Sequence, residues 1–470
     1  WEPGADLHKR AVSLTRAALA QGGELKGILW HQGCSDADKP ETAGTYAERF
    51  EKTVAAFRAE LGDVPVVAGE LGRYFKKDCP HWRTVNEQLH AAAKRIPRMK
   101  VVSSWNLKPK ADFVHFDTPS LRTLGIRYAQ AVFELDGRLP DVGKWRGVNL
   151  LGLFGAPNST NDPRCAEFTE STFAHLEKWG FNFARLPMDY RNFAATNDYF
   201  KLREEGYLQL DEAIAWGRKH HIHVQICLHR SPGFTIANWN PEPIRLQSDP
   251  LAQKAFVNLW RVFAKRYRGI PNEALSFNLL NEPAGFSTEQ YVRVFGDAVL
   301  AIREEDPNRF VMLDGNHVAS TPVKEFYSVR STGQAFRGYT PHAISHFGAW
   351  YIKDQPKRDP GWPMDPSVVD SRWIFEKPET TLEKFIKAVP SGYPAMIGEF
   401  GCYNKVSHET CLKWMEHCLK LWKEKNLGWA LWNLEGAFGI IDSGRADAQY
   451  EDFHGHRLDR KMLDLLSQYK

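Results

Sequence analysis

The sequence predicts an α/β protein in which a (β/α)8 barrel follows a smaller, incomplete α/β domain. Three observations favour this fold. From Trp145 onward, short apolar segments alternate with longer amphipathic segments, which is typical of successive βα units. Eight apolar segments of this kind occur, the number that closes such a barrel. Before residue 136 the pattern is different, and a polar stretch containing Gly and Pro separates the two regions.

The domain boundaries follow from this change of pattern. Residues 1–135 end in a helical pattern over 120–135, residues 136–144 read as a linker, and residues 145–470 form the barrel domain. The chain starts at Trp1 without a signal peptide, so we expect a processed form or a fragment. The 7 Cys have no zinc-type spacing, and their odd number leaves at least one without an intrachain partner.

Composition limits the possible partners. The 470 residues carry a net charge of +4 with no basic run, which gives no basis for binding nucleic acid or an anionic membrane. No apolar stretch reaches the roughly 18 residues of a membrane span. The 16 Trp and 15 Tyr are many for this length. Their ring faces pack well against sugar rings, although aromatic side chains also fill protein cores.

The predicted barrel strands are short and are separated by helical segments such as 251–268 and 288–305. An open doubly wound sheet is the alternative fold. It would require a glycine-rich phosphate turn after the first strand, and residues 147–155 do not supply one. The eight predicted strands are 147–151, 183–186, 224–228, 275–279, 310–313, 339–345, 395–397 and 428–432.

Polar side chains follow several of these strands, at the end of the barrel that carries catalytic groups. Asn281 and Glu282 follow the fourth strand, and Glu399 follows the seventh. A single Glu at a strand end is usually solvated, and Asn-Glu-Pro also occurs as a helix start. Two carboxylates from the fourth and seventh strands, with Asn before the first, form a much more specific set. The other candidates at strand ends are Arg185, His229, Tyr339, His346 and Trp432.

These motifs resemble glycoside hydrolase family 5. The resemblance covers residues 145–470 and is strongest at 228–234 (LHRSPGF), 275–283 (LSFNLLNEP) and 397–401 (IGEFG). The tail over 432–459 contains FGIID and YEDF and is similar to the bacterial endoglucanase branch.

The resemblance implies a retaining mechanism, in which two carboxyl groups about 5–5.5 Å apart act on one glycosidic bond. Glu399 is implied as the nucleophile and Glu282 as the acid/base. Arg185 would favour the ionised form of Glu399, and the Tyr339 hydroxyl would orient it.

Sugar contacts are also implied. Asn281 would hydrogen-bond the 2-hydroxyl, Trp432 would stack on the sugar ring, and His229 would bind a hydroxyl there. One position departs from the family pattern, because members often carry His two residues before the strand-six Tyr, where this chain has Arg337. Either the register of strand six differs, or His342 or His346 reaches the site.

The first region suggests a second chemistry. Residues 30–37 (WHQGCSDA) follow an apolar strand, and 112–117 (DFVHFD) precede LGIRYA. Asp112 and His115 have the types and spacing of the orienting acid and the base in a Ser-His-Asp hydrolase. Over about residues 25–135 the chain resembles SGNH-type carbohydrate acetylesterases, as in carbohydrate esterase family 6 and the sialate acetylesterases.

That resemblance implies an α/β/α SGNH-hydrolase-like domain with His115 as base and Asp112 as its partner. The nucleophilic Ser of the family lies in a Gly-Gln-Ser motif that this sequence lacks, and Cys34 stands where Glu is usual. The region is either a truncated esterase or a degenerate module, with a vestigial dyad in both cases. A missing first strand predicts an open sheet edge.

These observations together predict a retaining endo-β-glucanase acting on β-1,4-glucosidic bonds of cellulose or β-glucan. A β-mannanase or a mixed-linkage glucanase of the same fold stays open, since the choice depends on loop contacts near the 2-hydroxyl. The alternative class is an esterase–glycosidase fragment whose barrel is accessory or only binds carbohydrate. We expect a plant cell-wall polysaccharide as partner, no nucleic acid, no membrane, no cofactor and no metal. The expected location is secreted or periplasmic.

Overall fold

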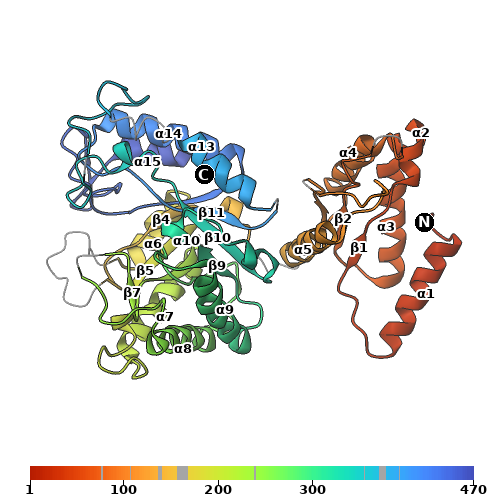
Figure 1. Ribbon diagram of the computed structural model, residues 1–470, viewed down its shortest axis with the longest axis horizontal. Coiled ribbons are helices and arrows are strands. Elements are labelled where there is room, and N and C mark those ends of the chain that lie inside the picture. Colours follow the sequence, from red (N-terminus) through yellow and green to blue (C-terminus); the bar gives the residue numbers. More distant parts are fainter. Residues whose placement is uncertain are drawn as a thin grey trace. The chain divides into compact units, whose positions relative to one another are not determined.

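The computed structural model describes residues 1–75, 78–105, 107–135, 140–155, 168–237, 240–353, 355–369, 377–390 and 392–469. Contacts divide the chain into two compact units (Figure 1). The first unit comprises Trp1–Leu139 and Ser391–Tyr393, and the second comprises Pro140–Pro390 and Pro394–Lys470.

The first unit is built on a small parallel sheet. Its strands β1 (Ile28–Trp30), β2 (Val66–Gly69) and β3 (Met99–Val102) pair in the order β1-β2-β3, so β1 is an edge strand of the described sheet. The helices are α1 (Asp6–Ala20), α2 (Pro40–Gly44), α3 (Tyr46–Leu61), α4 (Trp82–Ala93) and α5 (Thr118–Leu135).

Alternation along β2 explains the layers of this unit. Val66 and Ala68 are buried in one hydrophobic cluster with Phe50 of α3 and Leu89 of α4. Val67 belongs to a separate cluster that includes Leu124 and Tyr128 of α5. Because successive side chains of a strand point to opposite faces, α3 and α4 cover one face of the sheet and α5 covers the other. The unit is therefore an α/β/α sandwich.

The second unit is a closed barrel of eight parallel strands surrounded by helices (Figure 1). Its strands pair in the order β5-β4-β12-β11-β10-β9-β8-β6, and β5 pairs with β6 to close the ring. The strands are β4 (Arg146–Asn149), β5 (Phe183–Asp189), β6 (His223–Ser231), β8 (Leu275–Asn278), β9 (Val311–Asp314), β10 (Thr332–Arg337), β11 (Ala395–Phe400) and β12 (Gly428–Leu431).

Helices follow most of these strands. They are α6 (Glu170–Lys178), α7 (Glu204–Lys219), α8 (Pro250–Arg266), α9 (Thr288–Glu305), α10 (Asn316–Ala319), α11 (His342–Ser345), α13 (Pro378–Ala388), α14 (His408–Glu424) and α15 (Arg460–Gln468). Helix α9 starts where the sequence predicts, at a capping box formed by Ser287 and Gln290. Short strands add β7 (Phe234–Thr235), antiparallel to β6, and the hairpin of β13 (Glu451–Phe453) and β14 (His456–Leu458).

Aromatic packing closes the end of the barrel where the strands begin. The Trp145 ring lies 4.7 Å from the Phe183 ring and 4.3 Å from the His223 ring, measured between centroids. Arg146, the first residue of β4, donates from Nε to the carbonyl of Tyr469 over 2.9 Å, which ties the end of the chain to the first strand. This closed end directs ligand access to the opposite face, where the strands end.

The prediction of strand six is wrong. The strand is β10 (Thr332–Arg337), and the predicted range 339–345 instead ends in the short helix α11. Thr332–Arg337 lacks the expected apolar run and contains the polar residue Gln334. Gln334 is buried, and both ends of its side-chain amide bond the backbone of Val323. Such internal pairing makes a polar side chain compatible with a buried strand. The other seven predicted strands coincide with strands of the barrel.

Three other expectations concern the chain as a whole. Residues 136–139 of the predicted linker lie outside the described residues, and Val142–Lys144 form the 3-10 helix η2. Among the helices described, none combines the length and apolar character that crossing a membrane requires. Cysteines 34, 79, 227, 402, 411 and 418 are free thiols.

Candidate active site

The two predicted carboxylates meet at the carboxyl end of the barrel strands. Glu399 lies in β11 and is buried, and Glu282 follows β8. Oε1 of Glu399 accepts a hydrogen bond of 2.7 Å from Nη1 of Arg185, and Oε2 accepts one of 3.2 Å from the Tyr339 hydroxyl. The structure therefore brings Arg185 and Tyr339 to Glu399, as the sequence predicts.

Arg185 organises the centre of the barrel from β5. Its guanidinium is fully buried and donates to side chains from four other strands or their ends. Besides Glu399, these partners are Asn149 Oδ1 at 2.9 Å, Asn278 Oδ1 at 2.9 Å, Asn281 Oδ1 at 2.8 Å and Cys227 Sγ at 3.1 Å. Since each donor is used, the guanidinium has a single well-defined orientation, and so has the carboxylate it holds.

Glu282 has a different environment. Its Oε1 accepts a hydrogen bond of 2.9 Å from Nε of Arg337, and its side chain is 15% exposed. Burial and the nearby charge of Glu399 raise the pKa of Glu282 to about 7, against the opposing effect of Arg337. Its backbone has a φ of 47° and its N–H donates to Asp314 over 2.9 Å. Glu282 thus keeps its proton to a higher pH than an ordinary carboxyl does.

Arg337 occupies the position that departs from the family pattern, and it lies in the site. Its Nη2 donates to Asn281 Oδ1 over 2.7 Å, bonds Asp314, and lies 3.1 Å from Glu399 Oε1. A Cβ added at Gly398 would lie 2.8 Å from its Nη1, so the glycine before Glu399 makes room for the guanidinium. Arg337 therefore stands in the site at the position where family members often carry His, although the strand that carries it, β10, ends before Tyr339.

The amide of Asn281 is fixed by the two arginines. Both donate to its Oδ1, so its Nδ2 is the end that remains for another acceptor. Within the described residues this buried Nδ2 has no hydrogen-bond partner. A free donor of this kind is suited to a sugar hydroxyl.

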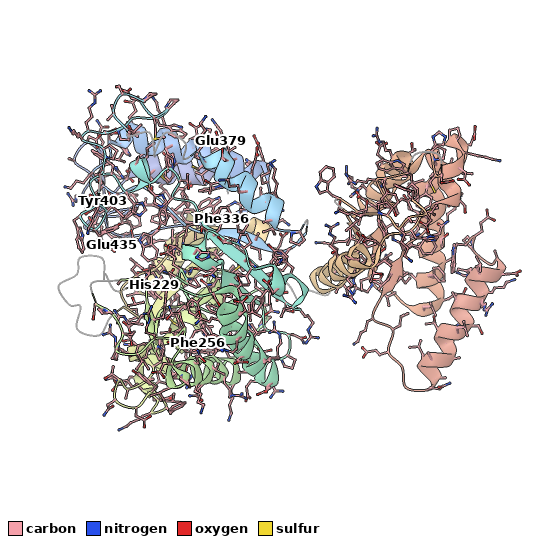
Figure 2. The ribbon with its side chains drawn as sticks, in the orientation of Figure 1. His229, Phe256, Phe336, Glu379, Tyr403 and Glu435 are labelled. Atoms are coloured by element: carbon pink, nitrogen blue, oxygen red, sulfur yellow. The ribbon has the colours of Figure 1, made fainter. Side chains whose placement is uncertain are left out.

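His229 and Trp432 form one wall of the site. Their rings stack with centroids 5.4 Å apart and an interplanar angle of 18°. Burial and the nearby arginines lower the pKa of His229 to about 3, so the ring is neutral. Its buried Nδ1 has no partner in the part of the chain described. Trp432 is partly exposed. Figure 2 labels His229 among the side chains of this unit.

His346 supports the site indirectly. Its ring packs edge-on against Tyr339 at 4.8 Å, and its Nδ1 pairs with the Ser345 hydroxyl at 2.8 Å. Ser345 in turn donates to the Tyr339 carbonyl over 2.6 Å. The His342 ring lies 5.4 Å from that of His346. From strand six and the residues just after it, Arg337 contacts both glutamates and Tyr339 contacts Glu399.

The sequence prediction missed four residues at the centre of the site. They are Asn149, Cys227, Asn278 and Asp314, all buried. Asp314 ends β9, and attention to the end of the predicted fifth strand could have found it. The others lie inside predicted strands, where the apolar pattern gives no sign of a polar role.

The predicted dyad of the first unit is also present. Asp112 Oδ2 and His115 Nδ1 lie 2.9 Å apart, with the side chains 46% and 72% exposed. Hydrogen bonds from the His115 backbone and ring hold the pKa of Asp112 well below its usual range. No serine hydroxyl or thiol bonds His115 within the residues described. The geometry supplies an oriented imidazole without a nucleophile bonded to it.

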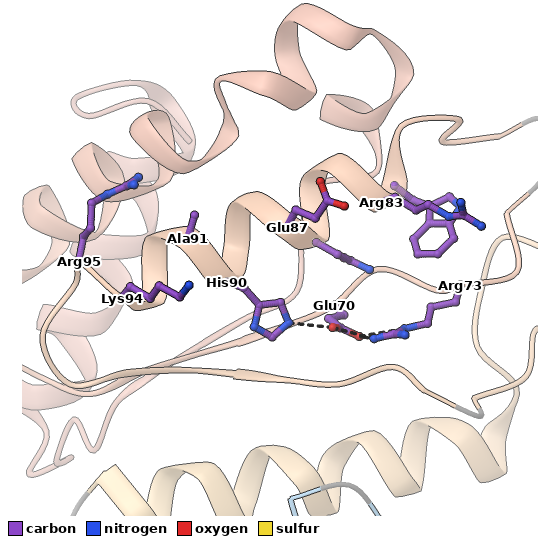
Figure 3. A pocket seen from close by; sticks show the side chains of 10 residues that line it. Glu70, Arg73, Arg83, Glu87, His90, Ala91, Lys94 and Arg95 are labelled. Atoms are coloured by element: carbon purple, nitrogen blue, oxygen red, sulfur yellow. Dashed lines mark hydrogen bonds and ion pairs between the residues drawn. The ribbon is translucent and has the colours of Figure 1, made fainter. Parts of the chain in front are cut away.

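A cavity of about 690 Å³ lies beside helix α4 in the same unit (Figure 3). His90 and Arg73 approach Glu70 from either side in this view, at 2.9 and 2.8 Å. Although burial opposes it, hydrogen bonds from His90, Ser104 and Arg73 bring the pKa of Glu70 down to about 2. Glu70 therefore acts as an anchor joining the end of β2 to α4 and to the loop after β3.

Comparison with known proteins agrees with this division. The family model for "Carbohydrate esterase, sialic acid-specific acetylesterase" matches residues 1–134. A probable carbohydrate esterase of Arabidopsis thaliana is 28% identical over 136 residues, which are 28% of this chain and 49% of that protein. The chain thus spans about half the length of that relative.

The barrel unit matches glycoside hydrolases. Endoglucanase C of Acetivibrio thermocellus is 25% identical over 337 residues, covering 65% of this chain and 95% of that protein. A crystal structure described as a glycoside hydrolase is 31% identical, with a TM-score of 0.62, covering 70% of this chain and 99% of that one. The fold is also that of Cel5A from Thermotoga maritima, at 21% identity, 71% and 98% coverage and a TM-score of 0.52.

The family model "Cellulase (glycosyl hydrolase family 5)" matches residues 144–438, more than half of the chain. Cellulases act on polysaccharide, and the barrel presents its paired carboxyls at the face where such enzymes work. The chain therefore belongs to glycosyl hydrolase family 5 and is a glycoside hydrolase.

Proposed function

We propose that the barrel is a retaining endo-β-1,4-glucanase, with Glu399 as nucleophile and Glu282 as acid/base. The observation that carries this proposal is the asymmetry between the two carboxyls. Glu399 is held by Arg185 and Tyr339, whereas the pKa of Glu282 is raised to about 7. Glu399 thus has contacts that suit a nucleophile, while Glu282 retains a proton that it can give to the leaving oxygen.

In the first step, a carboxylate oxygen of Glu399 attacks the anomeric carbon. Oε1 already accepts from Arg185, and within the described part of the chain Oε2 accepts only from the Tyr339 hydroxyl, so we assign Oε2 as the attacking atom. As the glycosidic bond breaks, Glu282 gives its proton to the leaving oxygen. A covalent glycosyl-enzyme and an ionised Glu282 result.

In the second step, Glu282 takes a proton from water. The resulting hydroxide attacks the anomeric carbon, and the bond to Glu399 breaks. Two inversions give net retention. Asn281 Nδ2, unpartnered among the described residues, donates to the 2-hydroxyl during both steps, and Trp432 supports the sugar ring.

Endo-action on β-1,4-glucan is supported by the relatives called endoglucanases, of which Endoglucanase C is covered over 95% of its length. The test is to incubate the chain with carboxymethyl-cellulose, mixed-linkage β-glucan, glucomannan and xylan, and to separate products by size. We expect a rapid fall in polymer length on carboxymethyl-cellulose. Faster cleavage of glucomannan would assign a mannanase instead, and release of only mono- or disaccharides would overturn endo-action.

A polymeric substrate also bears on location. A polymer such as cellulose or β-glucan is too large to cross a cell membrane, so its hydrolysis has to occur outside the cytoplasm. We therefore propose a secreted or periplasmic protein.

A further inference from the structure

Strand β10 brings a second buried guanidinium to the site, that of Arg337. Its side chain is 7% exposed and touches charged or amide groups from three other strands or their ends. Nε bonds Glu282, while Nη2 bonds Asn281 and Asp314 and lies 3.1 Å from Glu399. Among the described side chains, Arg337 alone hydrogen-bonds or ion-pairs with both carboxyls, because Arg185 bonds Glu399 but not Glu282.

We propose that Arg337 and Asp314 are a charge-compensated positioning pair, in which the guanidinium is shared by the two carboxyls while Asp314 cancels its excess charge. This rests on the roles of Glu282 and Glu399 proposed above. Arg337 contacts Oε1 of each carboxyl and not the Glu399 Oε2 assigned to attack, so it acts through the two carboxyls.

The net charge of this cluster is the same before and after the first step of the reaction. With Glu282 protonated, Arg185 and Arg337 face Asp314 and Glu399, and the cluster is neutral. In the glycosyl-enzyme, Glu399 has lost its charge in the ester bond and Glu282 has lost its proton. Arg185 and Arg337 then face Asp314 and Glu282, and the cluster is neutral again. The negative charge has moved from one partner of Arg337 to the other.

The other titratable groups that face this cluster do not change its net charge. Burial raises the pKa of Cys227 to about 12, and burial and the glutamates raise that of Tyr339 well above its usual value. His229 is neutral because its pKa is lowered to about 3. The pKa of Glu282 responds to burial, Glu399, Arg337 and Asp314.

Asp314 is essential to this balance. It is fully buried, and its Oδ1 accepts from Asn278 over 3.1 Å while Oδ2 accepts from the Glu282 backbone N–H over 2.9 Å. Without its charge, Arg337 would hold Glu282 in the ionised form, which cannot act as an acid. Without Arg337, Asp314 would repel a negative charge on Glu282, which cannot then act as a base.

The test uses three variants, Arg337→Gln, Asp314→Asn and the double variant, with the pH dependence of kcat/KM on an aryl β-cellobioside as readout. We expect the basic limb to move up by about one pH unit in Arg337→Gln and down by about one in Asp314→Asn. In the double variant the net charge of the cluster is again zero. The basic limb should therefore return to within a few tenths of a pH unit of its wild-type position. Shifts of the same sign, or no shift in either single variant, would overturn the proposal.

A second readout separates the two chemical steps. With 2,4-dinitrophenyl β-cellobioside, whose leaving group needs no proton, breakdown of the glycosyl-enzyme should limit turnover. Arg337→Gln should then lower kcat by about tenfold or more, lower KM with it, and give a burst of dinitrophenolate. A fall in kcat with unchanged KM and no burst would mean that Arg337 does not assist the base.

The matched control is Arg309→Gln. Arg309 is also fully buried, but it bonds the backbone carbonyls of Leu275 and Tyr267, away from the site. Its variant should lose thermal stability with no movement of the pH limb. Failure of the proposed function would be seen separately, as an absence of label on Glu399 when the wild-type chain is treated with an activated 2-deoxy-2-fluoro-cellobioside.

Discussion

The amide oxygen of Asn281 accepts a hydrogen bond of 2.8 Å from Nη2 of Arg185. Arg337 donates to the same oxygen over 2.7 Å. Since two cations both require an acceptor, the orientation of this amide is determined, and its Nδ2 faces away from both. Asn281, which precedes the proposed acid/base Glu282, therefore offers a fixed donor to the substrate.

Replacement of Asn281 by Ala should remove this donor. We expect kcat/KM on an aryl β-cellobioside to fall by about 10²-fold or more, because the contact to the 2-hydroxyl strengthens in the transition state. On the matching 2-deoxy substrate, wild-type and variant should differ by less than about tenfold. Equal losses on both substrates would show that Asn281 supports the site in another way.

The pH dependence of the wild-type reaction follows from Glu282. Its pKa is raised to about 7 by burial and by Glu399, and it has to be protonated to act as an acid. On a β-glucan or an aryl glycoside with a poor leaving group, kcat/KM should therefore fall as pH rises through about 7. Initial rates between pH 4 and pH 9 would measure this limb. A profile that stays flat to pH 9 would contradict the assignment.

The two carboxylates should give opposite products with azide. Glu282→Ala should turn over activated aryl glycosides, and azide should accelerate it and yield the β-glycosyl azide, because the covalent intermediate still forms. Glu399→Ala should be inactive on every natural substrate, and azide in place of the missing carboxylate should yield the α-glycosyl azide. Product configuration by NMR is the measurement, and exchange of the two outcomes would exchange the two roles.

Glu282 should lower the stability of the fold at alkaline pH. Its pKa is raised in the folded state, so the folded form favours the proton, and stability present below about pH 4.5 is lost as pH rises through about 7. Glu282→Gln should then melt about 4 °C above the wild type at pH 8 and within a degree of it at pH 4.5. Calorimetry at both pH values tests this, and a difference of the same size at each would refute it.

The dyad of the first unit should release no acetate from acetylated xylan. His115 is oriented by Asp112, but no hydroxyl or thiol bonds it within the described residues, and a base without a nucleophile leaves only weak catalysis. His115→Ala should therefore match the wild-type chain in an acetate assay. Acetate release that disappears in this variant would reveal a nucleophile brought to His115 by other means.

Most of the barrel could be predicted because its strands are buried on both faces and largely apolar. Phe183–Asp189 is buried along its whole length, and such runs separated by amphipathic helices leave few alternatives. Strand β10 was not predicted because Gln334 and Arg337 are polar residues buried with internal partners. A hydropathy pattern does not distinguish such residues from exposed ones. The predicted range, 339–345 (YTPHAIS), instead begins just after the strand ends.

The site followed the same rule. The positions of Glu282, Glu399 and Arg185 in or just after their strands could be predicted, because these strands are evident in the sequence and the residues belong to recognisable motifs. Arg337 was noticed only as a departure, because its role depends on Asp314, which comes from a different strand. A pair of this kind has no signature along the chain, and only the closing of the barrel brings its two halves together.

The bond from Arg146 to the Tyr469 carbonyl has a consequence for engineering. It places the first strand and the last helical turn of the barrel unit side by side, and β4 also pairs with β12. Because the ring of strands is closed, the chain of this unit could begin at a different strand without breaking the ring. A circular permutant that joins Tyr469 to Pro140 through a few glycines, and opens at an exposed loop elsewhere, would keep every strand pairing of the barrel.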